Sequence, residues 1–234
     1  MPFSPSVTAL DEHPNISMEP ITTHEDDGRS NTKVVFSIHT STHIDSPQHF
    51  YSDGTTIDQM ELEIFYGKTY MCDLRQIAKP GQALAVEDLK AGGLPQEDKL
   101  RGNRILMYAN WAASRWTGPD LYKGNMYLSE ETAHWLVDIG IVALAMDFSV
   151  DGHYPYPCHQ ILLAAGIPLI EINKTHSSIT FRELDSFTLD TTTVATSSLT
   201  GGGSNVVCTR NIMMDVMQPL LQTMELPGTT ISTL

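Results

Sequence analysis

The sequence predicts a single α/β domain built on a mixed β-sheet. Strand-like and helix-like stretches alternate through the middle of the chain, and the stretches towards both ends favour strands. A chain of 234 residues is long enough to bury a core of its own. It contains no internal repeat and no linker that would divide it. We therefore expect an N-terminal arm over residues 1–30, a main domain over 31–210, and a C-terminal tail over 211–234 that belongs to the same domain.

The N-terminal half shows strand signals separated by turns and short helices. Residues 1–30 are polar and contain prolines, so we expect an extended arm and loop there rather than a helix. Lys33 to Ile38 is β-branched and aromatic, which is typical of a strand. Pro47 ends the extended run that follows, and Asp53-Gly54 indicates a turn. Further strands are expected at 69–74 and 104–109, a short helix or turn at 61–67, and a short helix at 86–91.

The C-terminal half alternates more regularly. Ser129 can cap a helix whose first turn is acidic and which ends at Gly140. A second helix is expected over 159–165, before Gly166. Buried strands are expected at 141–146 and 168–172, and a hairpin at 191–199 and 206–210 around the glycine-rich tip 201–204.

Composition and charge exclude several classes of function. The chain carries 28 acidic and 14 basic side chains, and its net charge of −14 repels nucleic acid phosphates and anionic membranes. No apolar stretch is long enough to cross a bilayer, and the N-terminus does not resemble a secretory signal. Three widely spaced cysteines indicate free thiols in a reducing compartment. We expect a cytoplasmic protein whose partner is a small-molecule substrate, with no nucleic acid and no membrane partner.

Metal-ligand side chains are dense in the run that starts at residue 39, H-T-S-T-H-I-D-S-P-Q-H. Even offsets separate His39, His43 and Asp45, and such offsets place side chains on one face of an extended strand. His49 has the same parity, although Pro47 interrupts the extended run before it. Two imidazoles and a carboxylate suit Zn²⁺, Mn²⁺ or Fe²⁺ and leave positions open for water and substrate. A lone histidine is usually solvated or bonded to backbone, whereas this cluster favours a metal site.

A second pair of polar residues lies far along the chain. His159 begins a predicted helix, and Glu171 interrupts an apolar predicted strand. A buried carboxylate is costly unless it meets a cation. That cation could be a basic side chain in a salt bridge, or a metal ion for which both residues are ligands. The residues alone leave both readings open.

Together the two motifs resemble those of the cyclase-like metal-dependent hydrolases, the family that includes bacterial kynurenine formamidase and isatin hydrolase. The run from His39 to His49 is similar to the family signature H-x-G-T-H-x-D-x-P-x-H. The run from His159 to Glu171 is similar to its pattern H-x-x-L-L-x-x-G-I-x-x-x-E. The likeness covers residues 31–210.

The resemblance implies a fold, an assembly and a ligand set. The fold is the family's swivelling β/β/α domain, which is usually assembled as homodimers or homotetramers. One or two divalent ions are implied. His39, His43 and Asp45 would hold one ion, and Asp45 and Glu171 would bridge to a second ion that His159 also holds. The implied metal ligands are His39, His43, Asp45, His159 and Glu171.

The expected activity is hydrolysis of a C–N bond in a small aryl-formamide or a cyclic amide or imide. A bound Zn or Mn ion would activate water, and His49 would carry the proton from water to the leaving nitrogen. Substrate contacts are expected from Phe50, Tyr51 and Trp111, and from Ser41, which stands where the family usually has glycine. Two other classes stay open. One is a non-haem Fe(II) oxygenase, whose iron is held by two histidines and a carboxylate; the other is a natural-product cyclase or binding protein with the same pocket.

Overall fold

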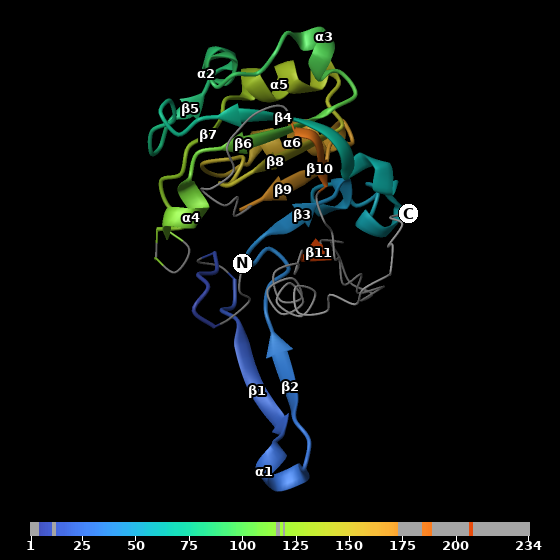
Figure 1. Ribbon diagram of the computed structural model, residues 1–234, viewed down its shortest axis with the longest axis vertical. Coiled ribbons are helices and arrows are strands. Elements are labelled where there is room, and N and C mark those ends of the chain that lie inside the picture. Colours follow the sequence, from blue (N-terminus) through green and yellow to red (C-terminus); the bar gives the residue numbers. More distant parts are fainter. Residues whose placement is uncertain are drawn as a thin grey trace, which may run out of the picture.

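The computed structural model describes residues 5–10, 13–115, 118, 120–172, 184–188 and 206–207. Its centre is a mixed sheet of seven strands (Figure 1). In sheet order these are β10 (Leu184–Thr188), β4 (Tyr66–Asp73), β6 (Arg104–Tyr108), β8 (Ala143–Met146), β9 (Leu169–Glu171), β3 (His43–Asp45) and β11 (Val206–Val207). The four strands from β4 to β9 are parallel, whereas β10, β3 and β11 each run antiparallel to a neighbour. The expected α/β class with a mixed sheet is confirmed.

Two helices, α5 (Glu130–Ile139) and α6 (Pro157–Ala164), pack against one another beside this sheet. α5 has the expected ends, because the Ser129 hydroxyl accepts a hydrogen bond from the Thr132 N–H and Gly140 ends the helix at a φ of 79°. α6 begins at Pro157, earlier than expected. The shorter helices are α2 (Val86–Ala91), α3 (Glu97–Leu100) and α4 (Trp111–Arg115).

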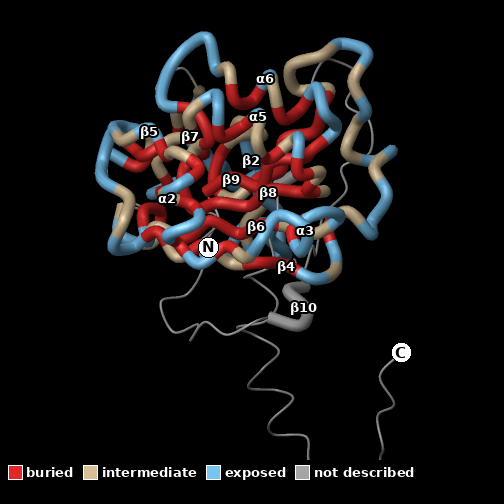
Figure 2. Tube along the Cα trace, turned by 90° about the horizontal axis from the view of Figure 1, so that it is seen from above, coloured by how far each residue is buried: buried red, intermediate tan, exposed pale blue. Residues whose placement is uncertain are grey.

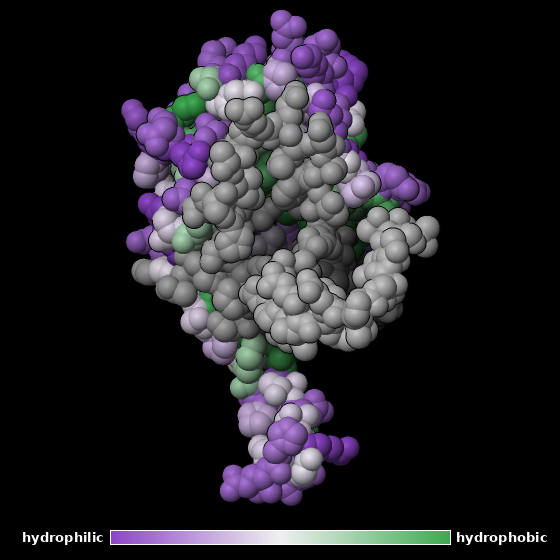
Figure 3. All heavy atoms as spheres, in the orientation of Figure 1, coloured by the Kyte–Doolittle hydropathy of each residue, from purple (hydrophilic) through white to green (hydrophobic). Residues whose placement is uncertain are grey.

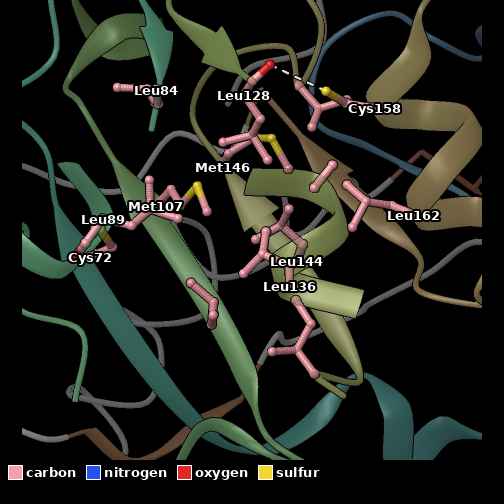
Figure 4. Close-up of a cluster of buried hydrophobic side chains, with 14 of the residues drawn as sticks. Cys72, Leu84, Leu89, Met107, Leu128, Leu136, Leu144, Met146, Cys158 and Leu162 are labelled. Carbon is pink, nitrogen blue, oxygen red and sulfur yellow. Dashed lines mark hydrogen bonds between the residues drawn. The ribbon is translucent and has the colours of Figure 1, made fainter. Parts of the chain in front are cut away.

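Alternate residues of the central strands face two separate hydrophobic clusters. Leu144 of β8 lies in the larger cluster with Leu136 of α5 and Leu162 of α6 (Figure 4). Its neighbours Ala143 and Ala145 lie in a cluster on the opposite face, which the chain between β3 and β4 covers. Burial is continuous along β6, β8 and β9 (Figure 2). These three central strands are therefore covered on both faces.

An N-terminal hairpin projects from the body of the molecule (Figure 1). It consists of β1 (Ser17–Thr22) and β2 (Asn31–Val35), with the single-turn helix α1 (His24–Asp27) at its tip. The expectation that no helix occurs in this arm is therefore wrong. One turn forms because the Thr23 side chain accepts from the Asp26 N–H and Gly28 ends the turn in the left-handed region, at a φ of 67°.

Exposed apolar side chains occur on this hairpin. The cross-strand pair Met18 and Val34 lies on one face, and the next pair, Glu19 and Lys33, lies on the other and forms an ion pair at 3.5 Å. Met18 and Val34 are both exposed. Figure 3 shows apolar surface where the hairpin meets the body and polar surface towards its tip. Val35, on the same face as Lys33, is exposed as well, so apolar side chains meet solvent on both faces. A ribbon of only two strands is marginally stable by itself.

The remaining elements are short. They are the strand pair β5 (Ala83–Leu84) and β7 (Tyr127–Leu128) and the 3₁₀ turns η1 (Pro47–His49), η2 (Ile57–Gln59) and η3 (Leu62–Ile64). The strands expected at 69–74, 104–109, 141–146 and 168–172 and the helix at 86–91 are all found, with small shifts at their ends. Most of the expected hairpin at 191–199 and 206–210, its tip at 201–204, and the tail over 211–234 lie outside the described residues. Within the described part of the chain, no helix is long and apolar enough to cross a membrane.

Replacing a core residue should measure how strongly this packing stabilises the fold. Leu144 is fully buried between the sheet and the helices. We expect Leu144→Ala to lower the free energy of unfolding by about 2–5 kcal/mol, because it removes buried methyl groups and leaves a cavity. Urea denaturation measures the change. The matched control Leu62→Ala, at a side chain that is 74% exposed, should change stability by less than about 0.5 kcal/mol; equal losses would contradict this packing.

Candidate metal centre

The central strand pair of the site is β3 against β9. His43 lies directly opposite Glu171 in this antiparallel pair, so their side chains share one face. Asp45 lies two residues along β3 and points to the same face. Ile44, between them, points to the opposite face and packs in the smaller hydrophobic cluster. Three ligand-type side chains therefore gather on the helix-covered side of the sheet.

His39 reaches the same place by a turn and not by an extended strand. The chain turns after residue 37, and Ser41 adopts a left-handed conformation with a φ of 71°. His39 Nδ1 nevertheless lies 3.2 Å from Asp45 Oδ1. The expectation that one strand aligns His39 with His43 and Asp45 is therefore wrong, although the side chains do meet. The left-handed backbone at Ser41 also explains the preference for glycine at this position, because glycine adopts it without a steric cost.

His49 is held by a tight turn beside the strand. η1 begins at Pro47, whose fixed φ suits the first position of a helical turn. The loop that follows packs closely on Pro47: a Cβ added to Gly54 would lie 2.6 Å from the Pro47 carbonyl carbon. This loop places the His49 ring 4.3 Å from the His39 ring, measured between centroids. The turn at Pro47 thus returns His49 to the cluster.

His159 lies in the first turn of α6, and Asp151 fixes the orientation of the His159 ring. The Asp151 carboxylate accepts hydrogen bonds from the backbone N–H groups of Cys158 and His159, at 3.0 and 2.9 Å. These are donors that a helix start leaves without partners. The same carboxylate accepts from His159 Nδ1 at 2.7 Å. The other ring nitrogen, Nε2, consequently faces Asp45 Oδ2 and Glu171 Oε1, each at 3.5 Å.

Glu171 is itself held by the loop after β8. Its Oε1 atom accepts from the Val150 N–H at 2.7 Å and from the Ser149 hydroxyl at 3.3 Å. The carboxylate is therefore fixed from one side by the protein, while its partners on the other side are His43 and His159. Among the described residues, the groups beside this carboxylate that can carry positive charge are imidazoles, so its role as a metal ligand stays a prediction.

Asp45 is the centre of the cluster. Its side chain is 1% exposed, and among the described residues no group is in hydrogen-bonding geometry with either of its carboxylate oxygens. Three imidazole nitrogens approach it instead, from His39, His43 and His159, at 3.2, 3.6 and 3.5 Å. A buried carboxylate without donors is costly unless a cation lies among these groups.

The ring orientations show what such a cation would meet. His43 Nδ1 lies 2.9 Å from the Ser41 carbonyl oxygen, which can only accept, so this nitrogen carries the proton. His159 Nδ1 likewise donates to Asp151. In the neutral rings, both Nε2 lone pairs therefore point towards carboxylate oxygens. Lone pairs facing anions repel unless a positive charge separates them, so these residues fit a divalent cation.

The pKa values of the cluster reflect the opposing effects of burial and of neighbouring charges. Burial lowers the pKa of His49 to about 4; neighbouring imidazoles add to this and Asp45 opposes it. Burial by itself would lower the pKa of His159 too. The negative charges of Glu171, Asp151 and Asp45 have the larger effect, so the pKa rises to about 10. Burial opposes ionisation of Asp45, yet the imidazoles around it hold its pKa well below the usual value. The cluster thus attracts positive charge, while His49 stays neutral at pH 7.

Two groups of ligand atoms share Asp45. One joins His39, Asp45 and His49, and the other joins His43, Asp45 and Glu171; within each, all ligand atoms lie within 4.8 Å of one another. This division differs from the implied one, in which His39 and His43 hold the same ion. In both divisions Asp45 would be shared if two ions bind. His49 is close enough to be a ligand, so its role as a proton carrier stays a prediction.

The residues expected to contact substrate are not all beside the histidine cluster. Phe50 stacks on His159, with ring centroids 5.2 Å apart, and Tyr51 donates to the Gln160 carbonyl oxygen at 2.9 Å. Ser41 is buried beside His43. Trp111 is in the hydrophobic core, where its indole N–H donates to the Leu121 carbonyl oxygen at 2.7 Å. Of these residues, Phe50 has its ring directly against the histidine cluster.

Two residues near the site have no spacing signal in the sequence. Tyr122 donates its hydroxyl to the His39 carbonyl oxygen at 3.5 Å. His13 lies with its ring 5.6 Å from the His39 ring, and its Nδ1 is 2.9 Å from the Ser37 hydroxyl. Both reach the site because the N-terminal segment packs with the chain around α4, through Val7, Ile16, Ala112, Leu121 and Ile172. Only the tertiary fold brings them there.

The N-terminal two thirds of the chain match a known family. The family model described as "Putative cyclase" matches residues 1–152. The chain belongs to this cyclase family. The match includes the first histidine run and the strands up to β8.

Two curated relatives of this cyclase-family chain are kynurenine formamidases. That of Bacillus cytotoxicus is 29% identical over 160 residues, which cover 66% of this chain and 70% of the relative. That of Geobacillus thermodenitrificans is 29% identical over 143 residues, which cover 59% of this chain and 62% of the relative. The matched stretch thus falls short of two thirds of the second relative's length.

Solved structures share the fold. Isatin hydrolase A from Labrenzia aggregata, bound to benzyl benzoate, superposes with a TM-score of 0.66 at 19% identity, and the match covers 88% of each chain. A predicted metal-dependent hydrolase from Bacillus stearothermophilus has a TM-score of 0.58 at 19% identity, covering 74% of this chain and 78% of that chain. Both superpositions support the family fold for the cyclase-family chain.

Asp151 provides a test of the ligand orientation. In Asp151→Asn the remaining oxygen can still accept from the helix start, but the amide no longer fixes which nitrogen of His159 carries the proton. We expect metal affinity to fall about 10- to 100-fold with the fold retained. A competition titration against a chelator of known affinity measures the loss, and circular dichroism checks the fold. The exposed control Asp138→Asn on α5 should bind metal as the wild type does; unchanged affinity in Asp151→Asn would refute the orienting role.

Proposed function

We propose that this protein is a metal-dependent amidohydrolase that cleaves the C–N bond of a small aryl-formamide or of a cyclic amide or imide. The observation that carries the proposal is the buried Asp45 carboxylate, which has imidazole nitrogens around it and no hydrogen-bond donor among the described residues. Membership of the cyclase family and likeness to kynurenine formamidases and to an isatin hydrolase support this reaction class.

The proposed cofactor is Zn²⁺ or Mn²⁺, as one ion or two. Imidazole and carboxylate ligands suit both metals, and two of the similar solved structures are described as metal-dependent hydrolases. Such a cation supplies an acidified water molecule and polarises the substrate carbonyl group. The proposal includes the expected cytoplasmic location, with which the buried free thiols of Cys72 and Cys158 agree.

The protein's own contribution to proton transfer is assigned to His49. Its pKa of about 4 leaves the imidazole neutral at pH 7, with a lone pair that can accept a proton. Phe50 packs edge-to-face against the His49 ring at 4.7 Å and excludes water from that side. The acquired proton would then pass to the nitrogen that leaves.

His49→Ala separates proton transfer from metal binding. We expect the variant to keep its metal and to lose about 10²- to 10⁴-fold in kcat, because the leaving nitrogen receives no proton. Metal content is measured by mass spectrometry and hydrolysis by ring opening or deformylation of N-formylkynurenine, isatin and simple cyclic imides. His43→Ala is the comparison, and it should lose metal. Loss of metal from His49→Ala would make His49 a ligand, and near-wild-type turnover would remove the shuttle role.

The oxygenase alternative differs in its need for oxygen. Two histidines and a carboxylate alone would satisfy an Fe(II) oxygenase, but the cluster also contains His49, His159 and Glu171. A hydrolase turns over equally well with and without O₂. Assays with and without O₂ of the protein loaded in turn with Zn²⁺, Mn²⁺ and Fe²⁺ therefore discriminate between them, and activity that requires Fe²⁺ and O₂ would overturn the hydrolase proposal.

We also propose the homodimer or homotetramer that the family resemblance implies. The exposed apolar side chains of the N-terminal hairpin, Met18 and Val34 among them, support an assembly that covers them. Met18→Glu should then shift the sedimentation coefficient to that of a smaller species, whereas Glu19→Gln, at the neighbouring polar side chain, should not. A wild-type protein that sediments as a monomer would refute the assembly.

A further inference from the structure

An aromatic group lies beside the metal centre on the loop before α6. Tyr156 contacts the rings of Phe50 and His159 edge-to-face, with centroid distances of 6.4 and 6.1 Å. Tyr154 contacts Tyr156 in the same way at 6.0 Å. Phe50 in turn packs against His49 at 4.7 Å. The rings form a continuous series from the surface to the histidine cluster.

The outer members of this series are exposed. Tyr156 is 42% exposed and Tyr154 is 81% exposed, whereas His159 is buried. The other large exposed apolar side chains of the described residues lie on or at the base of the hairpin, at Leu62, and at Tyr66. These two tyrosines therefore form the exposed aromatic surface next to the ligand cluster. Exposed apolar surface beside a polar centre is typical of a ligand site.

The backbone at Tyr156 is held in a costly conformation. Its φ of 62° and ψ of 55° lie in the left-handed region, which costs an L-residue with a side chain about 1–2 kcal/mol. Hydrogen bonds fix the loop: the Tyr156 N–H donates to the His153 carbonyl oxygen at 3.1 Å, and Gln160 Nε2 donates to the Pro155 carbonyl oxygen at 2.7 Å. Strain of this kind persists where the surroundings over-determine it, often at ligand clamps. The Tyr156 ring is thus presented in a fixed position.

We propose that Tyr156 is a specificity-determining residue that, together with Phe50, holds the planar ring of an aromatic amide. The inference rests on the proposed hydrolase function and adds the residue that selects the substrate. A ring packed against Tyr156 and Phe50 directs its attached amide towards His49 and His159, because Phe50 contacts both imidazoles. Aromatic pairs gain about 0.5–1.5 kcal/mol beyond the area they bury, so the site favours an aromatic over an aliphatic ring of equal size.

The test compares two formamides that differ only in ring character, formanilide and N-cyclohexylformamide. The wild-type protein loaded with Zn²⁺ or Mn²⁺ should show the lower KM for formanilide. Tyr156→Leu should reduce this aromatic preference about two- to tenfold through KM, with kcat for formanilide changed by less than about twofold. Tyr156→Phe, which keeps the ring, should retain the preference. Tyr66→Leu, at an exposed tyrosine on β4, is the matched control and should behave as the wild type does.

Other outcomes would overturn the assignment. Equal losses on both formamides, or a fall in kcat in place of a rise in KM, would show that Tyr156 only supports the structure. A changed sedimentation coefficient of Tyr156→Leu would show that the tyrosines belong to an interface between copies. If the loaded wild type hydrolyses neither of these formamides, nor isatin, nor a simple cyclic imide, the proposed function fails. Calorimetric titration with acetanilide and N-cyclohexylacetamide then decides this inference separately. A preference for acetanilide that Tyr156→Leu abolishes would support it, and equal binding by the wild type would refute it.

Discussion

The ionised carboxylate of Asp45 is the constraint on which the rest of the site depends. It is buried under the helix-covered face of the sheet, and nothing among the described residues donates a hydrogen bond to it. The effective cost of burying one ion in this way is several kcal/mol. A neutral imidazole at His43 or His159 cannot remove that cost, because its proton lies on the nitrogen that points away. A second proton on His159, whose pKa is raised to about 10, or a bound cation can do so. Only positive charge among the three groups makes the arrangement favourable.

This requirement couples the folding of separate elements. The Asp45 environment is complete only when β3 pairs with β9 in the register that sets His43 beside Glu171. A slip of one residue would exchange His43 and Asp45 for Ile44 on the site face and would bury charge in the opposite cluster. The Asp45 environment also requires that the first turn of α6 lie beside β3 and β9. Asp151 holds this turn in place by accepting hydrogen bonds from its backbone N–H groups. A bound cation would therefore stabilise the sheet register and the helix position together, since it binds the folded chain alone.

The sequence predicted this centre unevenly, for physical reasons. Parity along an extended strand correctly placed His43 and Asp45 on one face, because three residues of regular strand obey a local rule. It failed for His39, because a left-handed residue at Ser41 turns the chain, and nothing in the residue type serine predicts that conformation. The approach of His159 and Glu171 to Asp45 depends on the sheet order, which local patterns do not encode. Tyr122, His13 and Tyr156 arrive through tertiary packing and carry no spacing signal at all.

Ser41 shows how local strain and the central charge are connected. Its left-handed backbone costs about 1–2 kcal/mol compared with glycine, yet it is the conformation that brings the Ser41 carbonyl oxygen to His43 Nδ1. That hydrogen bond fixes the His43 tautomer and so directs the free lone pair at Asp45. Tyr156 also has a left-handed backbone, and its ring lies beside the His159 ring. Each strained residue thus contacts a histidine whose Nε2 atom faces Asp45: Ser41 contacts His43 through a hydrogen bond, and Tyr156 contacts His159 through its ring.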